Sequence, residues 1–161
     1  YFDSPQSLAA LVRNAKGFDA ANLVLYGDQQ VLRRDGASTP FPRPPVGLEK
    51  KALEGRMAIA HASSLWPTAL LRCLRFDESF RIALDYEFAL RSLELVQYRH
   101  VATRVAVITT DGLSNRPRSL LRVIAEDARA KRNNGLSPYS SPVLNLKRFL
   151  RWMSSPLTSR S

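Results

Sequence analysis

The sequence of 161 residues contains a single cysteine, Cys73, so it can form neither an internal disulfide nor a cysteine-based metal knuckle. No apolar run approaches the roughly 20 residues that span a bilayer, and no signal-peptide pattern opens the chain. A glycine-rich phosphate loop, a supported Ser–His–Asp arrangement and a zinc-type His/Cys cluster are also missing. These absences leave a cytoplasmic globular protein as the expected class, with peripheral attachment to the inner face of the cell membrane as an option.

Charge is distributed unevenly along the chain. Of the net charge of +10, residues 1–115 contribute only +2, from 14 lysines and arginines against 12 acids. Residues 116–161 contribute +8, from 10 lysines and arginines against Glu126 and Asp127. A basic tail on a near-neutral body indicates an attached contact segment more than a nucleic-acid-binding domain. We therefore expect a body over 1–115 and a basic helical tail over 116–161.

Helical and strand patterns alternate along the body, which predicts the α/β class. Four prolines within 39–47 predict an extended surface loop, and Gly27-Asp28 is expected to be a turn that ends the first strand. His100 is expected on the surface. The expected helices cover 4–17, 67–74, 85–96, 116–132 and 143–153, and the expected strands cover 22–26, 29–34, 57–60 and 98–110.

The most informative segment is 76–91, FDESFRIALDYEFALR. Asp85 falls in the first turn of the expected helix, after a loop with two aromatic anchors, Phe76 and Phe80. The positive end of a helix stabilises an ionised carboxylate by about 0.3–1 kcal/mol. Such a carboxylate at the mouth of an α/β sheet can take a proton from a hydroxyl nucleophile. From spacing alone, an ordinary helix-capping acid is the commoner explanation.

Four segments of the chain, 25–28 with Gly36, 61–65, 76–91 and 111–115, form a pattern in this order. In this pattern the chain resembles glycosyltransferase family 2, in particular its colanic-acid and exopolysaccharide biosynthesis type. The segments are similar to the family's YGD strand end with a following glycine, its HQ segment, its FDExFxxxxDYdfxLR signature and its GGxSn turn. Two positions depart from the pattern: Ala62 replaces the glutamine and Asp111 replaces the first glycine. Together the four segments cover the part of the chain over about residues 20–116.

The resemblance implies the C-terminal half of a GT-A fold and an inverting sugar transfer from a nucleotide-sugar donor. The acceptor would be a saccharide or lipid-linked saccharide in surface polysaccharide synthesis. Asp85 would be the general base that deprotonates the acceptor hydroxyl. The residues expected in or beside the acceptor site are His61, Asp77, Glu78, Tyr86, Glu87, Arg91, Gly112 and Ser114.

Structural roles remain open for several of these residues. His61 either touches the acceptor or the metal-diphosphate, or is a hydrogen-bonded structural histidine. Asp77 and Glu78 either line the acceptor cleft or cap their own loop, and loop capping is favoured. Arg91 either contacts phosphate or forms an ion pair within its own helix, and the ion pair is favoured.

Enzymes of this family hold a divalent metal, Mg²⁺ or Mn²⁺, through an aspartate motif in their nucleotide-binding half. No Asp-X-Asp occurs in this chain, so we expect the metal ligands to lie outside it. The matches begin where that motif would end, which implies a donor half before Tyr1 and no activity from this chain alone. A truncated product, one half of a split enzyme or an inert remnant fits the same pattern.

The segment 143–153 has an amphipathic pattern. A short basic amphipathic helix can lie on an anionic membrane, or can pack its apolar side on the body. The alternative to an enzyme is a non-catalytic module that binds nucleic acid or a membrane surface. The aromatic residues have the spacing of a hydrophobic core, which argues against a nucleic-acid-binding module. Leu146, Phe149, Leu150 and Met153 share one side, and Lys147, Arg148 and Arg151 the other.

Overall fold

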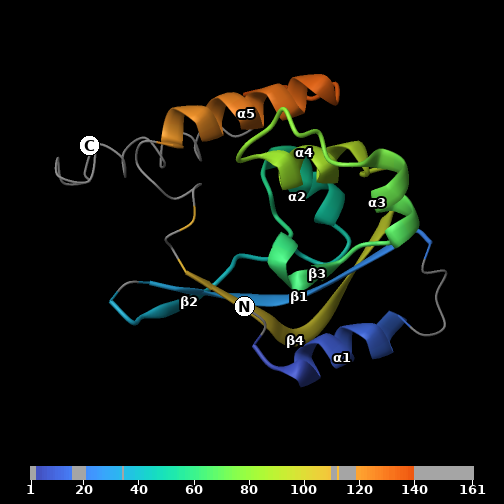
Figure 1. The fold of residues 1–161 in the computed structure, drawn as a ribbon, viewed down its shortest axis with the longest axis vertical. Helices are drawn as coiled ribbons and strands as arrows, with labels where there is room; N and C mark the ends of the chain where they lie inside the picture. Colours follow the sequence, from blue (N-terminus) through green and yellow to red (C-terminus); the bar gives the residue numbers. More distant parts are fainter. Residues whose placement is uncertain (1–2, 16–20, 34, 110–111, 113–118, 140–161) are drawn as a thin grey trace.

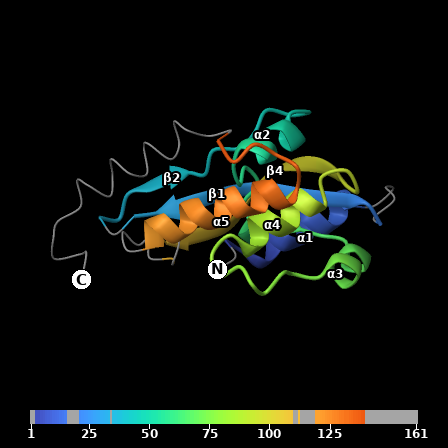
Figure 2. The same ribbon diagram turned by 90° about the horizontal axis from the view of Figure 1, so that it is seen from above.

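The computed structural model describes residues 3–15, 21–33, 35–109, 112 and 119–139. Within them, four strands form one mixed sheet, with α1 on one face and α2, α4 and α5 on the other (Figures 1 and 2). The expected α/β class is confirmed. The elements in chain order are α1 (Pro5–Ala15), β1 (Leu23–Leu32), β2 (Ser38–Pro40), α2 (Glu49–Gly55), the 3-10 helix η1 (His61–Ser63), β3 (Ser64–Leu65), α3 (Thr68–Leu74), α4 (Leu84–Arg91), β4 (Gln97–Thr109) and α5 (Leu120–Asn133).

Strand β1 organises the sheet. It pairs with β4 in parallel along its whole length, and with β2 and β3 in antiparallel directions. The parallel register is irregular at Gly27 and Asp28, because β4 has additional residues opposite this point. A Cβ on Gly27 would collide with the side chain of Val105 and would lie 2.6 Å from the carbonyl oxygen of Thr103. The close approach of β4 therefore requires glycine at this position.

Side chains alternate between the two faces of β1 and build two cores. On one face, Leu25 packs with Leu11 of α1 and with Val101 and Val105 of β4. Helix α1 begins as expected, with Pro5 in its first position, and the Ser7 N–H donates to Oγ of Ser4 at 3.2 Å.

On the other face of the sheet, α4 forms the centre of the core. Tyr26 of β1 packs with α2, α4 and the segment before η1 in one cluster of buried side chains. Helix α5 joins this cluster through Ala130. Lys131 is 3% exposed, and its Nζ donates to the carbonyl oxygen of Gly55 at 2.7 Å. The first helix of the basic tail therefore shares the core of the body, and the division at 115/116 stays a prediction.

Several expected elements differ from the structure. The strands expected at 22–26 and 29–34 are one strand, because Gly27-Asp28 lies inside β1 and is no turn. The apolar residues 57–60 are not a strand; Ala58 and Ile59 are buried in the core without a ladder partner. The loop expected at 39–47 begins in the edge strand β2, and the following α2 was not predicted.

The helix expected over 85–96 starts one residue earlier and stops at Arg91. Ser92 is the C-cap residue, and its hydroxyl donates to the carbonyl oxygen of Ala89 at 2.9 Å. The strand expected over 98–110 is present as β4, and α3 matches the helix expected over 67–74. The expected helix 143–153 lies outside the described residues, as does the turn 111–115 apart from Gly112. Among the described helices, none is long and apolar enough to cross a membrane.

Candidate functional site

Asp85, the expected base, is the second residue of α4 and is half-buried. Its Oδ1 accepts a hydrogen bond from the N–H of Tyr86 at 2.8 Å. Burial raises the pKa of Asp85; the positive charge of His61 and the Tyr86 N–H act against this, and the negative charge of Asp127 raises the pKa further. A carboxyl with a raised pKa is a stronger base, which is the property that general base catalysis requires.

His61 lies close enough to Asp85 for the two charges to interact. Its ring centroid is 6.2 Å from that of Trp66 and 6.1 Å from that of Phe76. A local hydrogen bond stabilises the backbone of η1: the Ser64 hydroxyl donates to the His61 carbonyl oxygen at 2.9 Å. Within the described residues, His61 Nδ1 is buried and has no hydrogen-bond partner. The imidazole thus packs beside the rings of Trp66 and Phe76, and its Nδ1 makes no hydrogen bond to the described residues.

The start of α4 is held by a second acid, Glu126 of α5. One carboxylate oxygen, Oε2, accepts hydrogen bonds from the N–H groups of Arg81 at 3.1 Å, Ile82 at 2.8 Å and Ala83 at 3.0 Å. Burial acts to raise the pKa of Glu126, but these N–H groups and Arg129 outweigh it, so the pKa lies below its ordinary value. Glu126 is therefore an ionised carboxylate at the positive end of α4.

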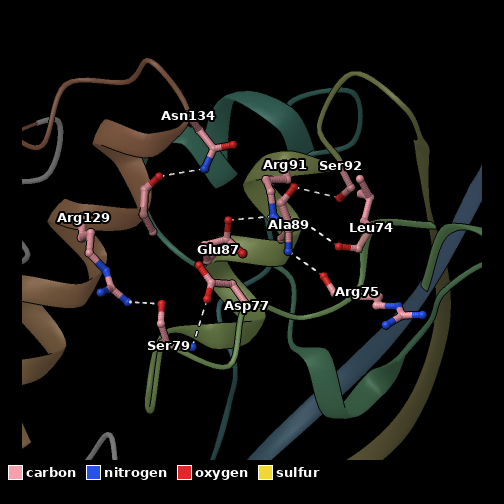
Figure 3. Close-up of polar contacts among 11 residues, drawn as sticks. Leu74, Arg75, Asp77, Ser79, Glu87, Ala89, Arg91, Ser92, Arg129 and Asn134 are labelled. Carbon is pink, nitrogen blue, oxygen red and sulfur yellow. Dashed lines mark hydrogen bonds and ion pairs between the residues drawn. The ribbon is translucent and has the colours of Figure 1, made fainter. Parts of the chain in front are cut away.

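Glu87 and Arg91 form a clamp on the same helix (Figure 3). Glu87 is 2% exposed, and its Oε1 accepts from Arg91 Nε at 2.7 Å. The same guanidinium donates to the carbonyl oxygens of Leu74 at 2.7 Å and Arg75 at 2.6 Å, where α3 ends. The ion pair expected for Arg91 is thus present, and it fastens the end of α3 to α4.

The loop before α4 contains two further expected site residues. Oδ1 of Asp77 accepts from the N–H of Ser79 at 3.0 Å (Figure 3). Hydrogen bonding from Ser79 is the main cause that lowers the pKa of Asp77. This geometry matches the favoured loop-capping role. Glu78 is exposed on the same loop.

Of the remaining expected site residues, Tyr86 contacts Asp85 through its backbone N–H. Tyr86 is buried, and its hydroxyl donates to the carbonyl oxygen of Leu53 at 2.9 Å, which anchors α4 on α2. Gly112 lies in an exposed bend. Ser114 lies outside the described residues. The charges of His61 and of Asp127 in α5 thus act on Asp85, while Glu126 of α5 holds the backbone just before α4.

A second polar cluster lies on β1 and β4. His100 Nε2 is 2.9 Å from Asp28 Oδ1, and Arg43 Nη1 is 3.0 Å from His100 Nδ1. Beside them, the Tyr26 hydroxyl donates to Oε1 of the buried Glu49 at 3.0 Å, and burial is the main cause that raises the pKa of Tyr26. The expectation of a surface His100 is therefore wrong, because its side chain is only 9% exposed and is held by Asp28.

Sequence reasoning missed Glu126 and Asp127 as site residues. The only signal was their isolation, since they are the sole acids in residues 116–161. In the described ranges, no three His, Cys, Asp or Glu side chains gather as a metal site would require. An apolar groove of about 240 Å³ lies between α1, β1 and the start of α3, and none of the expected site residues lines it.

The chain was also compared with known proteins. A scan against models of protein families finds no match, and a search of curated proteins finds no significant similarity. A functional argument for this chain therefore depends on its short motifs and on the geometry around Asp85.

Proposed function

We propose that the chain is the acceptor side of an inverting, family 2-like glycosyltransferase with a GT-A-like fold, in which Asp85 is the general base. One observation carries the proposal: Asp85 lies in the first turn of α4 as a half-buried carboxyl whose pKa is raised by burial, within reach of the charge of His61. A half-buried carboxyl with a perturbed pKa is more typical of a functional site than of a plain capping acid. The parallel pair β1–β4 with helices on both faces is compatible with the proposed fold.

The proposed reaction is a single displacement. The Asp85 carboxylate takes the proton of an acceptor hydroxyl while that oxygen attacks the anomeric carbon of the donor sugar. The bond between this carbon and the diphosphate oxygen breaks, the nucleoside diphosphate leaves with the electron pair, and the configuration inverts. The raised pKa favours the proton transfer because the carboxylate becomes a better proton acceptor.

The proposed donor is a nucleotide-sugar, and the proposed acceptor is a saccharide or lipid-linked saccharide. A divalent metal does not fit the described residues, which offer no group of three ligands, so no step is assigned to a metal on this chain. Attachment to an anionic membrane would be made by the tail. Arg129 and Lys131 make internal contacts, so the other cations of 116–161 would make that attachment.

Transfer by the native polypeptide tests the proposal. The protein is tagged at its C-terminus at the natural locus, purified at its native length, and incubated with labelled nucleotide-sugars, Mg²⁺ or Mn²⁺, and free or lipid-linked saccharides. Label should pass to an acceptor, and Asp85→Asn should lower the rate by about 10²–10⁴-fold, the usual contribution of a general base. Asp35→Asn is the control, because Asp35 is an exposed acid paired with Arg33.

The outcomes separate the two parts of the proposal. Transfer that Asp85→Asn leaves intact would refute the base assignment alone. No transfer from any nucleotide-sugar would refute the function as a whole. A loss of transfer in Asp35→Asn equal to that in Asp85→Asn would show that the effect is not specific to the site.

A further inference from the structure

The residues that lead into helix α4 are held by a side chain from another helix. The N-cap residue of α4 is Ala83, whose side chain offers no hydrogen-bond acceptor. Oε2 of Glu126 in α5 accepts hydrogen bonds from three consecutive N–H groups, those of residues 81–83, which end at this N-cap residue. Since Ala83 is only two positions before Asp85, the acid that stabilises the start of α4 also stabilises the backbone that carries Asp85.

Helix α5 also contacts the loop before α4 through Arg129, which lies about one helical turn after Glu126. The guanidinium carbon of Arg129 lies 3.7 Å from the ring centroid of Phe80, a cation–π contact. Nη2 of the same arginine donates to Oγ of Ser79 at 3.1 Å (Figure 3). Glu126 and Arg129 are three positions apart and so share one face of the helix. This face of α5 therefore covers the loop at two points.

We propose that Glu126 is a positioning residue for Asp85: by fixing residues 81–83 from α5, it sets the direction in which α4 presents the Asp85 carboxyl. The enzymatic meaning of this inference depends on the proposed function, but the positioning can be tested without activity. Displacements of about 1 Å at a reacting group are enough to cost about 10²-fold in rate. A carboxylate that fixes three backbone N–H groups is suited to prevent such displacements.

The charge of Glu126 matters as well as its position. Hydrogen bonds to a charged acceptor are stronger than those between neutral groups. The lowered pKa of Glu126 means that the carboxylate keeps its charge to a lower pH than an ordinary glutamate. Helix α5 thus supplies two neighbouring acids with different effects: Glu126 holds the backbone, and Asp127 acts on the titration of Asp85.

Nuclear magnetic resonance on the full chain tests the positioning. The variants are Glu126→Gln, which removes the charge, Glu126→Asp, which keeps the charge and shortens the reach, and Glu94→Gln as the control. Glu94 is a surface glutamate paired with Lys50. The quantities to measure are the amide hydrogen exchange of residues 81–83 and the carboxyl carbon shift and pKa of Asp85.

With Glu126→Gln, exchange at residues 81–83 should speed up by about tenfold or more as these hydrogen bonds weaken. The Asp85 carboxyl signal should move, and Glu126→Asp should have an intermediate effect. Glu94→Gln should change neither. A general loss of stability would not move the Asp85 signal of the folded state. An Asp85 signal unchanged in both Glu126 variants would therefore overturn the proposal, even if one of them folds poorly.

Kinetics in the native polypeptide then separate this inference from the proposed function. Glu126→Gln should lower kcat by about tenfold or more and leave the KM for the donor unchanged. A shifted Asp85 signal together with unchanged transfer would support the positioning of Asp85 and refute its importance for transfer. An unshifted Asp85 signal with reduced transfer would overturn the positioning and leave the proposed function standing.

Discussion

The clamp of Arg91 on Glu87 gives the sharpest prediction for stability. Replacing Arg91 with Met removes the partner of a carboxylate whose side chain is 3% exposed. It also removes two hydrogen bonds to the end of α3, those to Leu74 and Arg75. Breaking a buried ion pair by removing one partner costs about 3–5 kcal/mol, because the remaining charge is left buried. Arg91 itself is 28% exposed, so we expect the lower end of this range, about 3 kcal/mol.

For a chain of this size, about 1 kcal/mol corresponds to a change of about 2–4 °C in Tm, so Arg91→Met should lower the Tm by about 6–12 °C. Urea denaturation at pH 7 measures the free energy of unfolding directly. The double variant Glu87→Gln/Arg91→Met should recover about half of the loss, because a buried amide costs less than a buried charge.

The exposed pair of Lys50 and Glu94 provides the control. The side chain of Glu94 is 87% exposed, and removal of such a surface partner should cost less than about 0.5 kcal/mol. If Arg91→Met costs no more than Lys50→Met, the buried charge of Glu87 is not what the clamp neutralises. If the double variant is no more stable than Arg91→Met, the loss comes from packing and not from an unpaired charge.

Three further predictions follow from the site and the sheet. Asp85→Asn should raise the free energy of unfolding at pH 7, because burial raises the pKa of Asp85 and so disfavours its ionised form in the folded protein. Urea denaturation should show that this gain disappears near pH 3, where the carboxyl is protonated in both states. A lower free energy of unfolding at pH 7 would contradict the reasoning. In carbon-13 titrations, Asp127→Asn should lower the pKa of Asp85 and His61→Gln should raise it, so shifts in one common direction would refute the charge assignments. Gly27→Ala should destabilise the fold by about 2 kcal/mol or more, because the added Cβ would clash with β4. Gly112→Ala is the control and should cost less than about 0.5 kcal/mol, because no atom lies within 4 Å of the added Cβ. Equal losses of stability in calorimetry would exclude the clash.

The sequence was informative where local rules decide the structure. Ser4 and Pro5 predict the start of α1 because capping and the fixed φ of proline act within one turn of helix. The spacing of apolar residues likewise predicts α3 and β4. Asp85 could be placed in the first turn of a helix for the same reason, since the sequence 84–91 has helical periodicity.

Long-range contacts decided what the sequence could not predict. Gly27-Asp28 has the local signature of a turn, but the approach of Val105 on β4 makes the glycine a strand residue. The N–H groups of residues 81–83 find their acceptor in Glu126, more than 40 positions later in the chain, and no local pattern announces that pairing. The orientation of His100 depends equally on Asp28, which lies 72 positions before it.

The parallel pairing of β1 with β4 also has a consequence for how the chain folds. Leu23 pairs with Gln97 and Leu32 with Thr109, so the central ladder closes over the intervening residues 33–96. Contacts of such large sequence separation are formed late and slow the folding reaction. During synthesis, β1 leaves the ribosome well before β4 exists and exposes an unpaired, apolar edge until the last strand arrives. Destabilising changes in β4 should therefore reduce the yield of folded protein in cells more strongly than changes of equal cost in α1.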